Sequence, residues 1–142
     1  EEVRQIHVVI GAVNQNLRFL QKFSFSPKNK NKQVYIHQNL SATEMAGIMS
    51  QSDLAIVPAS TVSLEALASK VFILTGITVA NQVVMHKGLT KYSFVKSIDN
   101  FLTTELSELT EAIKEMVHNF RNYYFGDSII DAKAIKNIFK AL

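Results

Sequence analysis

The sequence has no cysteine and no tryptophan, and only two prolines and five glycines in 142 residues. Without cysteine the chain can form no disulfide, no thiol nucleophile and no cysteine-based zinc site, a composition that suits a reducing compartment. The longest apolar runs, at residues 8–10 and 71–74, are far shorter than the roughly 20 residues that a membrane-spanning helix needs. We therefore expect a cytoplasmic protein without a membrane span.

The sequence also lacks the dense positive charge that nucleic-acid binding requires. Its net charge is +3, only three residues are arginine, and the lysines are dispersed apart from a small cluster at Lys28, Lys30 and Lys32. A polyanion-binding face needs clustered basic side chains with interleaved aromatic rings. We predict a mildly basic, solvated surface and no nucleic-acid partner.

The chain does have the apolar content of a folded domain, since 47% of its residues are hydrophobic and 19% are charged. This composition predicts one globular domain over residues 1–142. The sequence begins Glu1-Glu2, with no initiator methionine and no signal-peptide pattern. We therefore expect an excised or truncated piece of a longer protein.

Short apolar runs alternate with helix-length amphipathic stretches, a pattern typical of βα units around a parallel sheet. The second, third and fourth of these runs, at residues 34–37, 54–57 and 71–74, are almost continuously apolar, as expected when helices cover both faces of a sheet. The sequence predicts an α/β fold with a Rossmann-like, three-layer parallel sheet of four to five strands. The expected strands are residues 7–10, 34–37, 54–57, 71–74 and, fifth, 92–95.

Local signals place several helices. Ser41 and Glu44 have the spacing of a capping box, with Leu40 and Met45 as a hydrophobic staple, and they predict a helix over residues 42–50. A second helix is expected to start after Pro58-Ala59-Ser60, with Ser60 or Thr61 as its N-cap. The residues expected to face the sheet from it are Leu64, Leu67 and Ala68, with Lys70 in the last turn.

Near the carboxyl terminus, apolar residues recur every three or four positions, which predicts two C-terminal helices. The first stripe begins at Leu106 and the second contains Ile135 and Ile138. Gly126-Asp127 separates the two stripes.

Ligands of open parallel sheets bind at the carboxyl ends of the strands, where helices present free backbone N–H groups. The turn after the third predicted strand carries Ser60, Thr61 and Ser63, with Glu65 one turn into the helix. Hydroxyls and N–H groups there suit a diphosphate, and a nearby carboxylate suits sugar hydroxyls. The same residue types are also common as plain helix caps, and composition does not separate the two interpretations.

The turn after the fourth predicted strand contains Asn81 and Gln82, whose amides suit a diphosphate, a sugar hydroxyl or a local turn. The turn after the first strand has a single glycine, Gly11, and no dinucleotide-binding pattern. No phosphate-binding G-x-x-x-x-G-K-[ST] loop and no G-x-S-x-G nucleophile elbow is present.

Four histidines, His7, His37, His86 and His118, are scattered along the chain. None forms the H-x-x-x-H spacing of a helical metal pair. We therefore expect no metal site. His37 ends a predicted strand, where it is either a ligand-facing or a structural histidine.

Residues 52–67, SDLAIVPASTVSLEAL, resemble the nucleotide-sugar motif of GT-B enzymes, and Ala80-Asn81-Gln82 fits the same pattern downstream. The chain is similar to the UDP-sugar hydrolases of pseudaminic acid biosynthesis and their relatives in spore-coat polysaccharide synthesis. The likeness spans nearly the whole chain and covers the C-terminal, Rossmann-like half of such an enzyme. Ala59-Ser60 stands where the family has Gly-Gly, and Lys70-Val71-Phe72 where it has Gly-Leu-Pro.

The resemblance implies a UDP-sugar ligand, with Ser60, Thr61 and Ser63 beside the diphosphate and Glu65 near the ribose. It places Asn81 and Gln82 near the diphosphate or the sugar. It also implies that no metal cofactor is needed and that an N-terminal domain outside this chain supplies the catalytic histidine. The expected function is the nucleotide-sugar-binding half of a glycosyltransferase or UDP-sugar hydrolase. The alternative is a non-enzymatic α/β module that binds a partner or dimerises.

Overall fold

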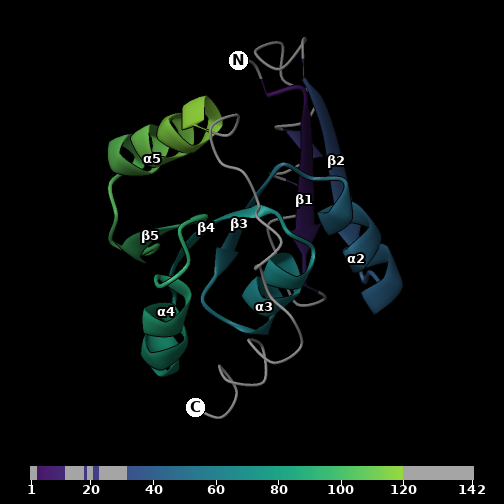
Figure 1. Ribbon diagram of the computed structural model, residues 1–142. Helices are drawn as coiled ribbons and strands as arrows, with labels where there is room; N and C mark the ends of the chain where they lie inside the picture. The colour runs from purple at the N-terminus through teal and green to yellow at the C-terminus, as the bar shows by residue number, and fades with distance from the viewer. Residues whose placement is uncertain (1–2, 12–17, 19–20, 23–31, 120–142) are drawn as a thin grey trace. The chain divides into compact units, whose positions relative to one another are not determined.

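The computed structural model describes residues 3–11, 18, 21–22 and 32–119 (Figure 1). The chain divides into two compact units, residues 1–48 and 49–142, each of which is considered by itself. All strand pairs in the described residues are parallel and helices follow them, so the predicted α/β, Rossmann-like fold class is confirmed. The expectation of a single domain over the whole chain stays a prediction.

Unit 1 contains a two-stranded parallel sheet, formed by β1 (Gln5–Ile10) and β2 (Gln33–Gln38), with Gln5 opposite Gln33. Tyr35 and Val9 are exposed, and in β2 exposed and half-buried residues largely alternate. The expectation that the second strand is covered on both faces is therefore not met. Between these strands the structure describes Arg18, Gln21 and Lys22, which are helical.

On the exposed face of this sheet His7 lies between Tyr35 and His37 of the neighbouring strand. Its ring stacks on Tyr35 at a centroid distance of 4.8 Å, and its Nδ1 lies 3.0 Å from Nε2 of His37. Partial burial lowers the pKa of His7, and the nearby His37 lowers it further.

The helix α2 (Ala42–Ser50) has the bounds that the capping box predicts. Glu44 Oε2 accepts hydrogen bonds from the backbone N–H of Ser41 at 2.8 Å and from its hydroxyl at 2.6 Å. The backbone N–H of Glu44 donates to Ser41 Oγ at 3.3 Å in return. These bonds to Ser41 lower the pKa of Glu44. Asn39, just before the helix, has a left-handed backbone with φ of 53°.

Unit 2 contains a three-stranded parallel sheet in the order β3–β4–β5 (Figure 1). Each strand is followed by a helix, as βα units require. In chain order the elements are β3 (Leu54–Pro58), α3 (Thr61–Ala68), β4 (Phe72–Ile77), η2 (Ala80–Gln82), α4 (Val83–Leu89), β5 (Val95–Asn100) and α5 (Leu106–Asn119).

Helices α4 and α5 cover opposite faces of this sheet. Ser97 hydrogen-bonds to His86 of α4, and Lys96 pairs with Glu115 of α5. Because successive residues of a strand point to opposite faces, these neighbouring contacts place the two helices on either side of β5. Figure 1 shows α3 and α4 on one side of β4 and α5 on the other. Unit 2 therefore has the three layers that the sequence predicts.

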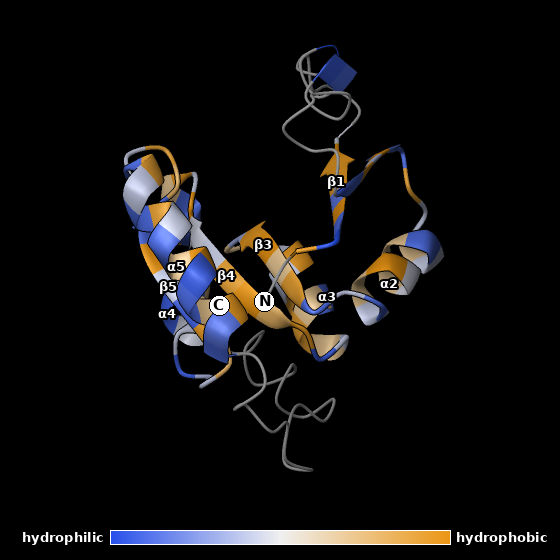
Figure 2. Cartoon of the chain, turned by 90° about the horizontal axis from the view of Figure 1, so that it is seen from above, coloured by the Kyte–Doolittle hydropathy of each residue, from blue (hydrophilic) through white to orange (hydrophobic). Residues whose placement is uncertain are grey.

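The core of unit 2 is centred on β4 and the helix before it. β4 is almost entirely buried, with Ile73 and Leu74 fully shielded from solvent, and Leu67 of α3 and Leu89 of α4 are equally buried. In Figure 2, β3 and β4 are coloured as apolar. Continuous rather than alternating apolar sequence is what a strand covered on both faces requires.

Two strand predictions need correction. The fourth strand does not end at residue 74 but runs to Ile77, because Thr75 and Gly76 still pair with β3 and Thr75 with Ser97 of β5. The fifth strand is Val95–Asn100, not residues 92–95. Residues 92–94 belong to a turn, in which Tyr92 N–H donates to Leu89 C=O. The buried aromatic side chain of Phe94 gives this turn the apolar character that suggested a strand.

The second helix starts as predicted, with Ser60 at its N-cap, and buries Leu64 and Leu67. Ala68 is exposed and Ala66 is buried instead, so the prediction for Ala68 is wrong. Lys70 lies beyond the helix end, not in its last turn.

The end of α3 is a Schellman motif. The N–H of Val71 donates to Ala66 C=O at 3.4 Å, and the N–H of Lys70 donates to Leu67 C=O at 3.0 Å. Lys70 has a left-handed φ of 57°, the conformation that glycine adopts most readily at this place.

Of the two predicted C-terminal helices, α5 (Leu106–Asn119) is present, and the second, containing Ile135 and Ile138, lies outside the described residues. Within the described part of the chain, no helix combines the length and apolar character needed to cross a bilayer.

Candidate functional site at the carboxyl edge of the sheet

Two turns of unit 2 leave the sheet at the same edge. β3 and β4 are parallel neighbours, with Pro58 opposite Gly76. The pairing continues one residue past β3, because the N–H of Ala59 donates to Gly76 C=O at 3.0 Å. The turn before α3 and the turn before α4 therefore begin side by side at the carboxyl edge, where open parallel sheets bind ligands.

The start of α3 leaves the hydroxyls of Ser60 and Thr61 uncommitted to capping. Ser60 has an extended backbone at the N-cap, and its side chain makes no capping hydrogen bond. Thr61 is exposed and Ser60 is half-buried. The N–H of Ser63 is already bonded to Ser60 C=O. The donors at this end of α3 that suit an anion are therefore the N–H groups of Thr61 and Val62, the first two of the helix, beside the two hydroxyls.

The Ser63 side chain points into the protein and not toward solvent. Its side chain is fully buried, and its hydroxyl donates to Ser60 C=O at 2.5 Å, beside the bond of 3.0 Å from its own N–H to the same oxygen. The hydroxyl proton is therefore engaged in holding the turn. Of the three predicted hydroxyl residues, Thr61 is exposed, Ser60 is half-buried and Ser63 is buried.

Glu65 lies on the solvent face of α3. It is exposed, and it follows Thr61 by four residues, so the two side chains are neighbours on one helix face. The buried stripe, which includes Ser63 and Leu67, occupies the other face. The carboxylate is therefore one helical turn from the Thr61 hydroxyl and free to meet a polar ligand from solvent.

Asn81 and Gln82 lie on the neighbouring turn but differ in their contacts. Gln82 Oε1 accepts hydrogen bonds from the backbone N–H of Thr78 at 2.8 Å and from its hydroxyl at 3.1 Å. This side chain closes the turn after β4. Asn81 is exposed on η2. The structure thus brings Ser60, Thr61 and Asn81 to adjacent strand ends, with Gln82 as the support of the second turn.

Sequence analysis missed an apolar feature of the same edge. Val79, Val83 and Val84 follow β4 and are exposed, and Leu102 and Leu106 follow β5 and are 75% and 77% exposed. Leu106 was expected in the apolar stripe of the first C-terminal helix, and its exposure contradicts that assignment. These five residues are called the apolar rim below. The signal available in the sequence was the Val83-Val84 pair at a helix start.

A buried polar cluster beneath α4 was also missed. His86 Nε2 lies 2.7 Å from Ser97 Oγ and 3.2 Å from Ile98 C=O. Thr75, opposite Ser97, is fully buried, and its hydroxyl has no hydrogen-bond partner.

The Ser97–His86 distance suits a nucleophile and its base, but the Ile98 carbonyl can only accept, so it requires a proton on Nε2. A protonated Nε2 cannot take the Ser97 proton. The arrangement is therefore that of a structural polar cluster.

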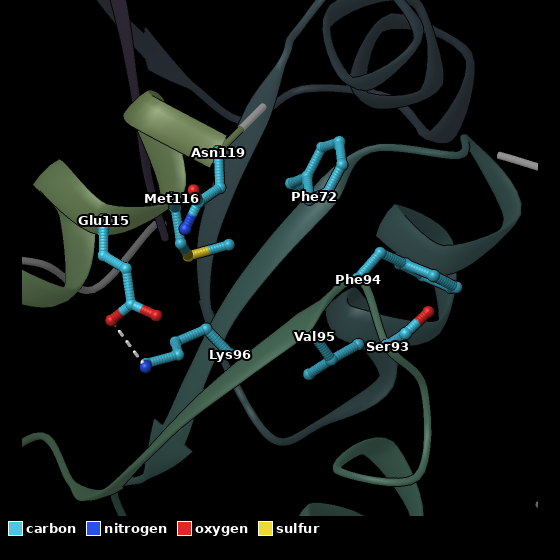
Figure 3. A pocket seen from close by; sticks show the side chains of 8 residues that line it. All are labelled: Phe72, Ser93, Phe94, Val95, Lys96, Glu115, Met116 and Asn119. Atoms are coloured by element: carbon cyan, nitrogen blue, oxygen red, sulfur yellow. Dashed lines mark hydrogen bonds and ion pairs between the residues drawn. The ribbon is translucent and has the colours of Figure 1, made fainter. Parts of the chain in front are cut away.

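A small hollow lies at the opposite end of the strands. It is lined by residues of β4, β5 and α5, among them Lys96 and Glu115, which form an ion pair of 2.7 Å (Figure 3). Phe72 and Val95 of its lining are the first residues of β4 and β5. The hollow is therefore not part of the carboxyl-edge site.

Among the described residues, no group of three or more histidine, cysteine, aspartate or glutamate side chains is arranged to hold a metal ion. No protein-family model matches this chain, and no curated protein matches it.

Proposed function

We propose that this chain is the nucleotide-sugar-binding half of a GT-B type enzyme, a glycosyltransferase or UDP-sugar hydrolase of surface polysaccharide or nonulosonic acid synthesis in the cytoplasm. The observation that carries the proposal is the uncapped start of α3, where Ser60 and Thr61 lie beside the turn that bears Asn81. Hydroxyls, an amide and helix N–H groups at one strand edge are the donors that a diphosphate requires.

The end of α3 supports the proposal independently. The GT-B pattern has glycine where this chain has Lys70, and Lys70 adopts a left-handed backbone, which glycine adopts without strain. A backbone suited to glycine at that position is consistent with descent from the pattern, although the side chain differs.

In this proposal, the chain's own residues bind and orient the leaving group. The Ser60 and Thr61 hydroxyls and the start of α3 would stabilise the negative charge that develops on the diphosphate as UDP leaves, and Glu65 would accept hydrogen bonds from the ribose. The group that activates the attacking water or sugar hydroxyl would come from the N-terminal domain. No metal is required for this charge stabilisation.

The test is isothermal titration of the full chain with UDP. We expect saturable heat that Glu65→Ala abolishes and that Glu108→Ala, the loss of an exposed carboxylate on α5, leaves unchanged. Thr61→Val would weaken binding by removing one hydroxyl with little change in side-chain volume. No heat at millimolar UDP, or equal loss in both glutamate variants, would refute the proposal.

A second candidate function rests on the apolar rim. Exposed apolar side chains can mark interaction surfaces, and these five follow the carboxyl ends of two neighbouring strands. This edge would then contact a partner protein or a second copy of the chain instead. Sedimentation velocity tests the second function by measuring self-association. If the wild-type chain self-associates, the double variant Val84→Asp/Leu102→Asp does not, and titration with UDP gives no heat, the binding module is favoured.

A further inference from the structure

The two histidines on the exposed face of unit 1 form a hydrogen-bonded pair that joins the two strands of its sheet. His7 is on β1 and His37 is on β2, and the parallel register sets His7 opposite Tyr35, two residues before His37. His7 Nδ1 lies 3.0 Å from His37 Nε2. At this distance one nitrogen donates its N–H and the other accepts it with a lone pair. The bond therefore depends on how many protons the two rings carry.

From this geometry we infer that the His7–His37 pair is a pH-sensitive switch in the sheet of unit 1, which keeps its hydrogen bond with one added proton and loses it with two. A first proton on the outer nitrogen of the donor ring leaves the shared N–H in place and gives the bond a charged donor, which strengthens it. A second proton must occupy the accepting nitrogen. Two N–H groups and two positive charges then face each other, so the rings separate.

The surroundings of His7 decide the order in which the two rings take up protons. Partial burial lowers the pKa of His7, and a charge on His37 lowers it further. The first proton therefore enters at His37, whose Nε2–H remains the donor to His7 Nδ1, and the second enters at His7. Because the unfolded chain takes up that proton at higher pH, the bond stabilises unit 1 fully above about pH 6.5. This stability is lost as the pH falls through the lowered pKa of His7.

No other charged side chain of the described sheet face compensates a doubly protonated pair. The Tyr35 ring stacks on His7 at a centroid distance of 4.8 Å, and its hydroxyl donates to Gln33 Oε1 at 2.9 Å. A phenol stays neutral throughout the acid range. Gln5 and Gln33, which bond to each other at 3.1 Å, and Val9, opposite His37, carry no charge. Both ion pairs of the described residues lie in unit 2.

The experiment follows the imidazole nitrogen NMR chemical shifts of the full chain from neutral to acid pH, which report the protonation of each ring nitrogen. We expect His37 to titrate before His7, and His7 Nδ1 to stay unprotonated until its own transition. His37→Gln removes the first charge, so His7 should titrate at higher pH than in the wild-type chain. The matched control is His118→Gln, an exposed histidine of α5, which should leave the His7 transition unchanged.

Amide hydrogen exchange tests the consequence for the sheet. Through the His7 transition, the protection of the β1 and β2 amides should fall at least about fivefold relative to that of the β4 amides, the factor that one lost hydrogen bond contributes. In His37→Gln this relative loss should disappear, because the glutamine oxygen can accept a hydrogen bond from protonated His7.

Simultaneous titration of the two rings in the wild-type chain would overturn the inference, as would a His7 transition that His37→Gln leaves unmoved. Unchanged protection of β1 and β2 relative to β4 would refute the switch as well. The wild-type readouts need no variant, so they decide the question even if a substitution disturbs folding. Because the pair lies in unit 1 and makes no use of the carboxyl edge of unit 2, the outcome is independent of UDP binding.

Discussion

In β4 of unit 2, five of six residues are buried, whereas in β1 of unit 1 only Ile10 is buried. Both strands lie in parallel sheets, but β4 has a strand on each side and helices over both faces, while β1 pairs with β2 alone in the part of the chain that the structure describes. Parallel strands gain stability chiefly from burial on both faces. The difference teaches that similar apolar sequences contribute differently to stability, according to how many neighbours cover them.

The largest expected effect contrasts the two sheets through one type of substitution. Ile73→Ala in β4 removes a fully buried side chain and should lower the free energy of unfolding by about 2–5 kcal/mol. Ile6→Ala in β1 removes a half-buried side chain and should cost about 1 kcal/mol. Urea denaturation followed by far-ultraviolet circular dichroism measures both. Equal costs would show that the described burial does not govern stability.

A smaller effect is expected from adding a methyl group at two glycines. A Cβ at Gly76 of β4 would lie 3.0 Å from Ile98 Cγ1 and from Phe101 Cδ2, and 3.1 Å from the Ile98 carbonyl oxygen. Because the backbone oxygen cannot move aside cheaply, Gly76→Ala should destabilise the chain by about 1–3 kcal/mol.

The matched substitution in unit 1 is Gly47→Ala in α2, where the methyl group meets nothing within 4 Å. It should stabilise the helix by about 0.5–1 kcal/mol, since alanine loses less backbone entropy than glycine. Thermal melts of both variants check the opposite signs. The same sign in both would contradict the close approach of β5 to Gly76.

Local signals predicted the elements well where the interactions are local. The Ser41–Glu44 pair set the start of α2, because a capping box depends on residues three apart. Ser60 stands at the N-cap position of α3 as expected, but its side chain makes no capping hydrogen bond. The fifth strand was misplaced because its position depends on pairing with β4, and Ile98 is the only buried residue within it. The turn at residues 92–94 contains the buried Phe94, and its apolar sequence resembled that of a strand.

The candidate site was predictable in outline but not in side-chain direction. The rule that ligands bind at the carboxyl ends of parallel strands located Ser60, Thr61 and Asn81. The inward orientation of Ser63 follows from its hydrogen bond to Ser60 C=O, which no spacing reveals. The His7–His37 pair was missed for a related reason: it forms across two strands thirty residues apart, so a search for helical spacing could not find it.

The smallest expected effect compares two left-handed residues, one in each unit. Lys70 of unit 2 has φ of 57° and Asn39 of unit 1 has φ of 53°. A lysine Cβ in this conformation approaches the following carbonyl oxygen, at a cost of about 1 kcal/mol, whereas asparagine is among the residues that tolerate it. Lys70→Gly should therefore raise the free energy of unfolding by about 1 kcal/mol, and Asn39→Gly by only a few tenths. Differential scanning calorimetry of the two variants measures the difference. An equal gain in both would mean that the backbone conformation alone, and not the lysine side chain, sets the cost at the end of α3.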